Sequence, residues 1–212
     1  MEKGRKRFLC ASVGAILLFA VWTALVRLVD VNPIGPLGTS VGLSGLNGYF
    51  HGLTGVNMSL YTVTDWMGLV PIAVALGFAV LGLIQWIKRK TILKVDRSIL
   101  VLGGFYLVVM AFYCAFEFAV VNYRPVLING YLEASYPSST TLLTLCVMPT
   151  AMIQLGSRIK NKRLKYAVNI LIALFTAFTV FGRIFSGVHW ITDIAGGVIL
   201  SAGLIFLYIA FE

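Results

Sequence analysis

The chain has 212 residues, of which 59% are hydrophobic and only 12% are charged. A soluble domain is roughly 45–50% apolar, so this composition excludes an ordinary soluble protein and indicates an integral membrane protein. The net charge of +9 is compatible with nucleic-acid binding, but the positions of the charges indicate a membrane topology instead.

Six apolar runs are long enough to cross a bilayer as helices, which takes about 20 residues. They cover residues 8–29, 66–87, 98–121, 138–156, 164–185 and 190–211. The first run follows a basic start, as in a signal peptide, but no clear small-residue cleavage site comes after it, so we interpret it as a retained helix. We expect an all-α polytopic membrane protein with six transmembrane helices and a single domain over residues 1–212.

Basic residues gather on one side of this six-span arrangement. Fourteen of the 17 Lys and Arg residues precede the first span or lie between spans two and three and spans four and five. Cytoplasmic loops carry an excess of Lys and Arg, so both termini are expected to be cytoplasmic, in a plasma membrane. Membrane lipids are then the expected partners, no nucleic acid is expected, and the oligomeric state stays open.

The connection over residues 30–65 is the longest one, and it is too apolar for a solvated linker. Its spaced Gly, Ser and apolar residues predict a short interfacial helix or a re-entrant segment around 41–58. Further along, Gly103-Gly104 and Gly196-Gly197 are expected to allow close packing of helices.

Two signals flank the next outer connection. Arg124 precedes Pro125 at the end of the third span, and a proline disfavours helix at the residue before it. Ser138 follows Pro137 and precedes an apolar run, which is typical of a helix start. A helix N-terminus offers free N–H groups and a positive dipole end, which suit phosphate.

The third signal lies between the last two spans, where Arg183, His189 and Asp193 occur within eleven residues. His189 and Asp193 are four residues apart and would share one face of a helix. Ionisable groups at membrane depth are costly and indicate function. A guanidinium group can bind two phosphate oxygens at once, so Arg183 is a candidate phosphate ligand. His189 is the candidate nucleophile, oriented by Asp193.

In this order, Arg-Pro, Pro-Ser and Arg-x5-His-x3-Asp resemble the type-2 phosphatidic acid phosphatase superfamily, over about residues 117–193. Its membrane members are six-helix lipid phosphatases and phosphotransferases. The resemblance implies that two arginines hold the phosphate, that the serines at the helix start cradle it, and that the histidine attacks phosphorus while the aspartate supports it. These residues are Arg124, Arg183, Ser138, Ser139, His189 and Asp193.

Four family positions differ in this chain. The family Gly after Pro-Ser is Ser139 and the Ser before the second Arg is Gly182, and two further changes affect the chemistry. The family lysine seven residues before Arg124 is Glu117, and the histidine two residues after Ser138 is Thr140. The family histidine protonates the leaving oxygen, which a threonine hydroxyl does poorly. Glu117 is expected to neutralise Arg124 or Arg183 inside the membrane, or else to serve as a catalytic acid or to contact a cationic headgroup.

Three explanations follow from the missing histidine. The leaving group needs no strong acid, which favours a polyprenyl diphosphate such as undecaprenyl diphosphate; or another group supplies the proton, with Glu117 and His51 as candidates; or the site binds a lipid phosphate without turnover.

We therefore expect an outward-facing lipid phosphatase that acts through a phosphohistidine, with its site on the extracytoplasmic face. The alternatives are a lipid phosphotransferase and a non-catalytic protein that binds or transports a lipid phosphate. The sequence shows no metal-ligand spacing and no nucleotide-binding loop, so no metal and no cofactor are expected.

Overall fold

The computed structural model describes residues 2–212, and its regular structure within this range is helical. The α-helices are α1 (Glu2–Leu28), α2 (Ser44–Thr54), α3 (Met58–Met67), α4 (Leu69–Arg89), α5 (Arg97–Phe118), α6 (Ser139–Arg158), α7 (Lys162–Phe185) and α8 (Ile191–Phe211). Two short 3-10 helices, η1 (Pro36–Gly38) and η2 (Ile92–Lys94), lie in the connections.

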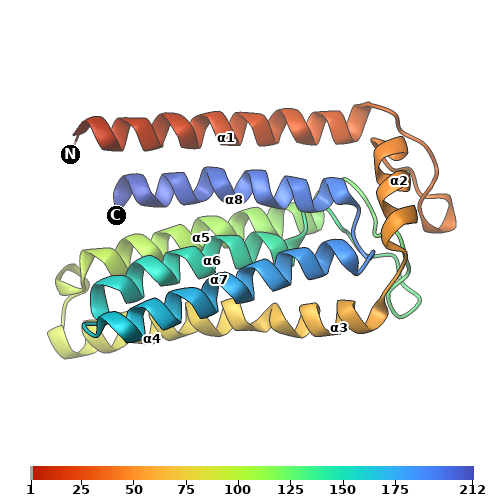
Figure 1. Cartoon of the computed structure of the whole chain (residues 1–212). Coiled ribbons are helices and arrows are strands. Elements are labelled where there is room, and N and C mark those ends of the chain that lie inside the picture. Colours follow the sequence, from red (N-terminus) through yellow and green to blue (C-terminus); the bar gives the residue numbers. More distant parts are fainter. Residues whose placement is uncertain (1) are drawn as a thin grey trace.

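Among these residues, six segments are long and apolar enough to cross a membrane, namely α1, the pair α3–α4, α5, α6, α7 and α8. The all-α, six-span prediction is confirmed. Both chain termini lie at one end of the bundle, together with the α4–α5 and α6–α7 connections (Figure 1). The fourteen clustered cations therefore share that end, as the topology prediction requires. That this end is cytoplasmic stays a prediction.

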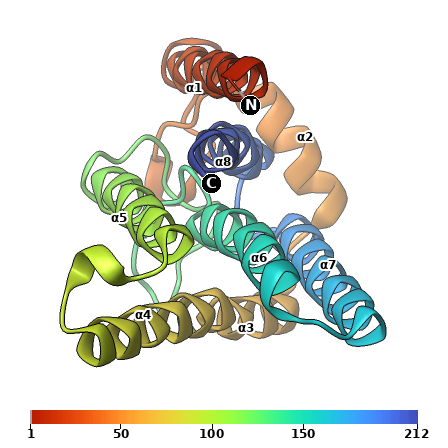
Figure 2. The ribbon, with the colours of Figure 1, turned by 90° about the vertical axis from the view of Figure 1, so that its left-hand side faces the viewer.

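The middle of the bundle is formed by α8. Helix α1 packs on one side of it, while α5 and α6 lie on the other (Figure 2). Gly196, Gly197 and Gly203 allow this packing, since a Cβ at Gly197 would lie 3.2 Å from the Ser138 carbonyl oxygen. The expectation for Gly196-Gly197 is thus correct. Gly103 and Gly104 differ, because a Cβ at either would meet nothing within 4 Å.

The second span begins earlier than the predicted residue 66. Helix α3 starts at Met58, where the Asn57 side chain caps it by accepting the Leu60 N–H at 2.9 Å. It meets α4 at Gly68, and the two helices together form the span Met58–Arg89. Hydropathy missed the first two turns because Thr62, Thr64 and Asp65 interrupt the apolar run there.

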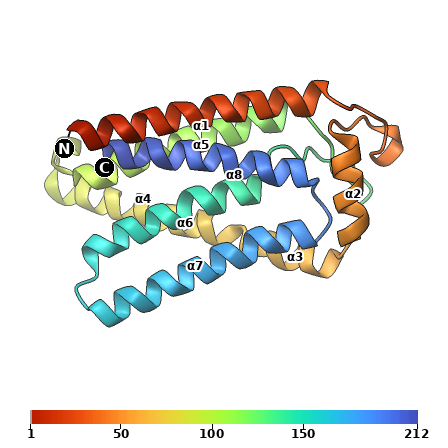
Figure 3. The same cartoon turned by 45° about the horizontal axis from the view of Figure 1, so that its top comes forward.

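The predicted interfacial helix is present as α2, which lies across the end of the bundle opposite the termini (Figure 3). Buried Asn47 fastens it to α8, because its side-chain amide donates to Thr192 Oγ1 at 3.0 Å and to the Gly42 carbonyl at 2.8 Å. The third span is shorter than predicted and ends at Phe118, not at residue 121. Residues 119–138 then form the α5–α6 connection, next to α2 at the same end of the bundle.

Candidate active site

The candidate site lies where the α5–α6 connection meets the ends of α6, α7 and α8. Short backbone bridges fold this connection back on itself. The Arg124 N–H donates to the Glu133 carbonyl at 3.0 Å, and the Ser135 N–H donates to the Asn122 carbonyl at the same distance. These bonds fix the backbone of Arg124, so its side chain reaches the site from a supported position.

The imidazole of His189 is held between two guanidinium groups. Its Nε2 lies 3.0 Å from Arg124 Nη1 and 2.9 Å from Arg183 Nη2. A guanidinium only donates hydrogen bonds, so Nε2 accepts both, and the imidazole is neutral with a lone pair on this nitrogen. Burial, together with the positive charges of Arg124 and Arg183, holds the pKa of His189 well below its usual range. The nitrogen that faces the arginines therefore carries the imidazole lone pair.

Asp193 is close to His189 but does not bond to it. Its Oδ2 lies 3.6 Å from His189 Nδ1, which is too long for a hydrogen bond. The carboxylate instead accepts the Trp190 N–H at 3.0 Å and the Asn122 side-chain amide at 3.3 Å. The expectation that both residues share one helix is wrong, because α8 begins at Ile191. Asp193 caps this helix start and so supports the turn that carries His189.

Each arginine also meets a carboxylate on the side away from His189. Arg183 Nη1 lies 3.3 Å from Asp65 Oδ1, and Arg124 Nε lies 3.0 Å from Glu133 Oε2. The Arg183 side chain is 0% exposed, while that of Asp65 is 52% exposed. Arg183 Nη2 is thus buried against His189, whereas Nη1 faces the half-exposed carboxyl group of Asp65.

Glu117 was the expected partner of an arginine, and this prediction is wrong. Because α5 ends at Phe118, no helix carries Glu117 and Arg124 on one face. Glu117 is exposed and lines a small pocket with Tyr113 and Ser139, and within residues 2–212 it forms no ion pair.

Tyr61 and Asp65 are the site residues that the sequence reasoning missed. They lie one turn apart on α3, and the Tyr61 ring packs beneath both guanidiniums, with its centroid 4.9 Å from Arg183 Cζ and 5.6 Å from Arg124 Cζ. The prediction placed this stretch in a loop. A signal was present, since Asp65 is the single acidic residue between positions 58 and 89.

The start of α6 falls where it was expected, but its side chains point in different directions. The Ser138 N–H donates to the Asp193 carbonyl at 3.0 Å, and Ser138 Oγ accepts from Thr141 Oγ1 at 3.0 Å. Ser138 therefore ties α6 to α8. Ser139 faces the pocket beside Glu117. Of the predicted phosphate-binding residues, Arg124 and Arg183 lie on His189, whereas the two serine hydroxyls are directed elsewhere.

Thr140, which occupies the position of the family histidine, is buried against the junction of α3 and α4. A Cβ at Gly68 would lie 3.4 Å from Thr140 Cγ2 and 2.9 Å from the Asp65 carbonyl oxygen. The position to which the resemblance assigns the leaving-group acid is therefore next to the backbone of Asp65.

His51 reaches the site from α2. Its ring lies 5.4 Å from the Trp190 ring, and it lines a small pocket with His189 whose other walls are largely apolar. Burial lowers the pKa of His51. Neither arginine lines this pocket, so His51 approaches the imidazole without contacting the guanidinium pair.

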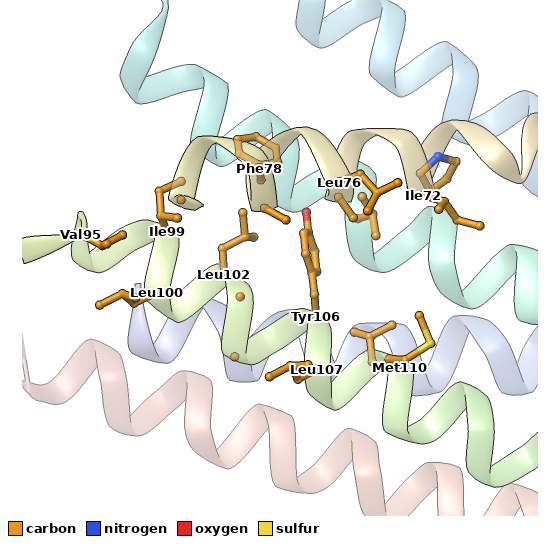
Figure 4. Close-up of a pocket in the computed structure, with 18 of the residues that line it drawn as sticks. Ile72, Leu76, Phe78, Val95, Ile99, Leu100, Leu102, Tyr106, Leu107 and Met110 are labelled. Carbon is orange, nitrogen blue, oxygen red and sulfur yellow. The ribbon is translucent and has the colours of Figure 1, made fainter. Parts of the chain in front are cut away.

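A large apolar groove runs along the bundle below the site, between α4 and α5 (Figure 4). It has a volume of about 600 Å³, and its floor is formed by Leu143 and Val147 of α6. Gly103 and Gly104 lie in its wall, which explains why they have no close neighbours and why the helix-packing role predicted for them is wrong. Leu143 is one helical turn after Thr140, so the groove begins just below the α3–α4 junction.

A six-span helical bundle that holds a neutral imidazole between two arginines at one end has the architecture of a membrane-embedded lipid phosphatase. Residues 112–212 match the family model described as the PAP2 superfamily. The resemblance drawn from the three motifs is thereby confirmed over the region from residue 112 to 212. Tyr61 and Asp65 lie outside the matched region.

The whole fold is similar to the crystal structure of a transmembrane PAP2-type phosphatidylglycerolphosphate phosphatase from Bacillus subtilis. The TM-score is 0.60, and the match covers 95% of each chain with 20% sequence identity. At this identity the likeness shows the fold alone. No curated protein matches the chain significantly.

Proposed function

We propose that the protein is an outward-facing lipid phosphatase that acts through a phosphohistidine at His189. The observation that carries this proposal is the lone pair of His189 Nε2, which is held within 3.0 Å of Arg124 Nη1 and 2.9 Å of Arg183 Nη2. Guanidinium N–H groups in this arrangement can exchange the imidazole for phosphate oxygens and leave Nε2 facing phosphorus.

The reaction follows from this geometry. Arg124 and Arg183 hold the phosphate oxygens and offset the charge that develops on them. His189 Nε2 forms a bond to phosphorus as the bond to the leaving oxygen breaks, and water later attacks phosphorus to release inorganic phosphate. Asp193 acts through the α8 start that it caps, which holds the imidazole in place.

We further propose a polyprenyl diphosphate, such as undecaprenyl diphosphate, as the substrate. A phosphate leaving group needs less acid assistance than an alkoxide, which suits a site where Thr140 replaces the family histidine and where the carboxyl group on Arg183, that of Asp65, is half-exposed. The apolar groove is long enough to hold an extended hydrocarbon chain. Its α4 wall runs from Pro71 to Trp86 and is about 22 Å long at 1.5 Å per residue. Each buried CH₂ group contributes about 0.8 kcal/mol.

The proposed location is the plasma membrane, with the site on the extracytoplasmic face. The support is the separation of charge along the bundle. The clustered cations lie at the end that carries both termini, and the His189 site lies at the opposite end (Figure 1).

A phosphate-release panel in detergent tests the function. The substrates are a polyprenyl diphosphate, the corresponding monophosphate and phosphatidate. We expect the diphosphate to be hydrolysed fastest, with a phosphoenzyme that is stable in base and labile in acid. Equal rates on monoesters and diphosphates would refute the leaving-group argument. Binding of all three lipids without phosphate release would favour the non-catalytic alternative, and release only in the presence of an acceptor would favour a phosphotransferase.

A further inference from the structure

We propose that Asp65 is the group that donates a proton to the leaving oxygen. This assignment rests on the proposed function, in which His189 is the nucleophile. Asp65 lies outside the region that matches the family model, and the family position for this role holds Thr140.

The first argument is the geometry of the Arg183 fork. Its two terminal nitrogens face different groups, since Nη2 lies 2.9 Å from His189 Nε2 and Nη1 lies 3.3 Å from Asp65 Oδ1. A phosphate bound to both prongs would sit between the imidazole and the carboxyl group. Displacement at phosphorus is in line, so the leaving oxygen departs on the side away from the nucleophile. Asp65 is the acid on that side of the fork.

The second argument is the direction of the lipid chain. The leaving group carries the chain, so it must face the apolar groove. The groove begins at Pro71 and Leu143, directly below the junction where Thr140 contacts Gly68. Asp65 lies one turn before Gly68 on the same span and is 52% exposed. It therefore lies where a lipid in the groove would present its leaving oxygen.

The other acids and the second histidine are placed less well. Glu133 Oε2 lies 3.0 Å from Arg124 Nε, but it is not aligned to accept the hydrogen of that nitrogen. It lies on the α5–α6 connection, which does not contribute to the groove. Glu117 contacts neither arginine, and His51 lies in a pocket that neither arginine lines.

Asp65 meets Arg183 as a carboxylate, so the incoming phosphate, bound with one P–OH group, brings the proton that Asp65 relays to the leaving oxygen. As the N–P bond to His189 forms, the P–O bond to the leaving group breaks with its electron pair on oxygen, and that oxygen takes the proton of the Asp65 carboxyl group. Water then attacks phosphorus and gives a proton to the Asp65 carboxylate, while the N–P electron pair returns to Nε2. Asp65 passes this proton to the departing inorganic phosphate and returns to the carboxylate that meets Arg183.

The dependence on leaving group tests this role. Asp65→Asn keeps an oxygen that can accept from Arg183 but removes the acid. A monophosphate leaves as an alkoxide and needs the proton, whereas a diphosphate leaves as a phosphate. We expect the ratio of kcat on polyprenyl diphosphate to kcat on polyprenyl monophosphate to rise at least about 100-fold in this variant. Asp65→Glu is expected to restore much of the monophosphate rate.

Glu133→Gln is the matched control, since it neutralises the carboxylate on the other arginine and is expected to lower both rates by the same factor. An unchanged ratio in Asp65→Asn would overturn the proposal and reduce Asp65 to a partner of Arg183, while the phosphatase itself would stand. The same holds if the ratio rises as far in Glu133→Gln. A wild type that releases no phosphate from the diphosphate would overturn the proposed function as well, and one that cannot hydrolyse the monophosphate would overturn the proton-donor role alone.

Discussion

The two sides of the candidate site are built differently. In the proposed mechanism, the attacking side consists of Arg124, Arg183, His189 and Asp193, and the leaving-group side consists of Asp65, Thr140 and the apolar groove. On the attacking side the Arg183 side chain is 0% exposed, while the Asp65 side chain on the other is 52% exposed. The attacking side is buried, with both guanidinium groups bonded to His189, whereas the leaving-group side opens toward the groove between α4 and α5.

This difference follows from what each side must do. A nucleophile and its phosphate-binding groups gain most from fixed positions, because they then need no rearrangement in the transition state. A long lipid has to enter and leave, so the opposite side cannot be packed as tightly. The comparison yields five predictions, from the largest expected effect to the smallest.

Removing the nucleophile should abolish the reaction. His189→Asn is expected to lower kcat by at least about 10⁴-fold on every substrate, because no other buried imidazole faces the arginine pair. Phosphate release and phosphoenzyme formation measure this. The thermal midpoint in detergent serves as the folding control. Substantial activity in a folded variant would exclude His189 as the nucleophile.

Replacing the buried fork by a point charge should also be severe. Arg183→Lys is expected to lower kcat/KM about 10²–10³-fold, because one ammonium cannot hold two phosphate oxygens and orient His189 as well. Arg124→Lys should cost less, since the Arg124 side chain is 9% exposed and has more room to adjust. Steady-state kinetics on one lipid diphosphate compare the two. The reverse order would show that the more buried fork is not the main phosphate ligand.

The acid limb of the pH profile reports on the attacking side. An ordinary histidine with a pKa of about 6.5 would lose about nine-tenths of its neutral form at pH 5.5. Burial and the two arginines lower the pKa of His189, so its neutral form persists below pH 6.5, and kcat/KM should fall by much less than tenfold at pH 5.5. Arg124→Gln removes one cation and should move the limb to higher pH. A wild-type limb centred at pH 6.5 would contradict the neutral imidazole.

Filling the groove should affect binding and spare the chemistry. A Cβ at Gly104 meets nothing within 4 Å, so Gly104→Leu should fold normally while its side chain narrows the groove. We expect KM for a polyprenyl diphosphate to rise several-fold, up to about tenfold, with kcat nearly unchanged. Gly77→Leu on the neighbouring helix is the control, because Gly77 does not line the groove. Equal KM values in the two variants would place the lipid chain elsewhere.

The smallest effect is expected at Glu117. It is exposed and contacts neither arginine, so Glu117→Gln should change kcat/KM by less than about twofold. The same assays apply. A loss of kcat/KM of tenfold or more would show that Glu117 takes part in the reaction although it forms no ion pair with either arginine.

Much of the fold could be predicted because the transfer of a helix into the membrane depends on the hydrophobicity of that stretch of sequence alone. Each span has to be long and apolar by itself, so the number of spans and the interfacial helix are visible in the residue pattern. The boundaries were less accurate where polar residues lie inside a span. Thr64 and Asp65 moved the predicted start of the second span to residue 66, although the helix begins at Met58.

The candidate site shows the same division. The Arg-x5-His-x3-Asp spacing by itself brought together three of the four residues of the attacking side, because local chain geometry keeps Arg183, His189 and Asp193 close together. Only the tertiary structure decided which carboxylates meet the arginines. Helix α5 ends at Phe118, so it does not continue to Arg124, and Glu117 does not face that arginine. The second span changes direction at Gly68, and Asp65 meets Arg183 there. A contact between residues 118 positions apart depends on helix packing in space, and no local pattern encodes it.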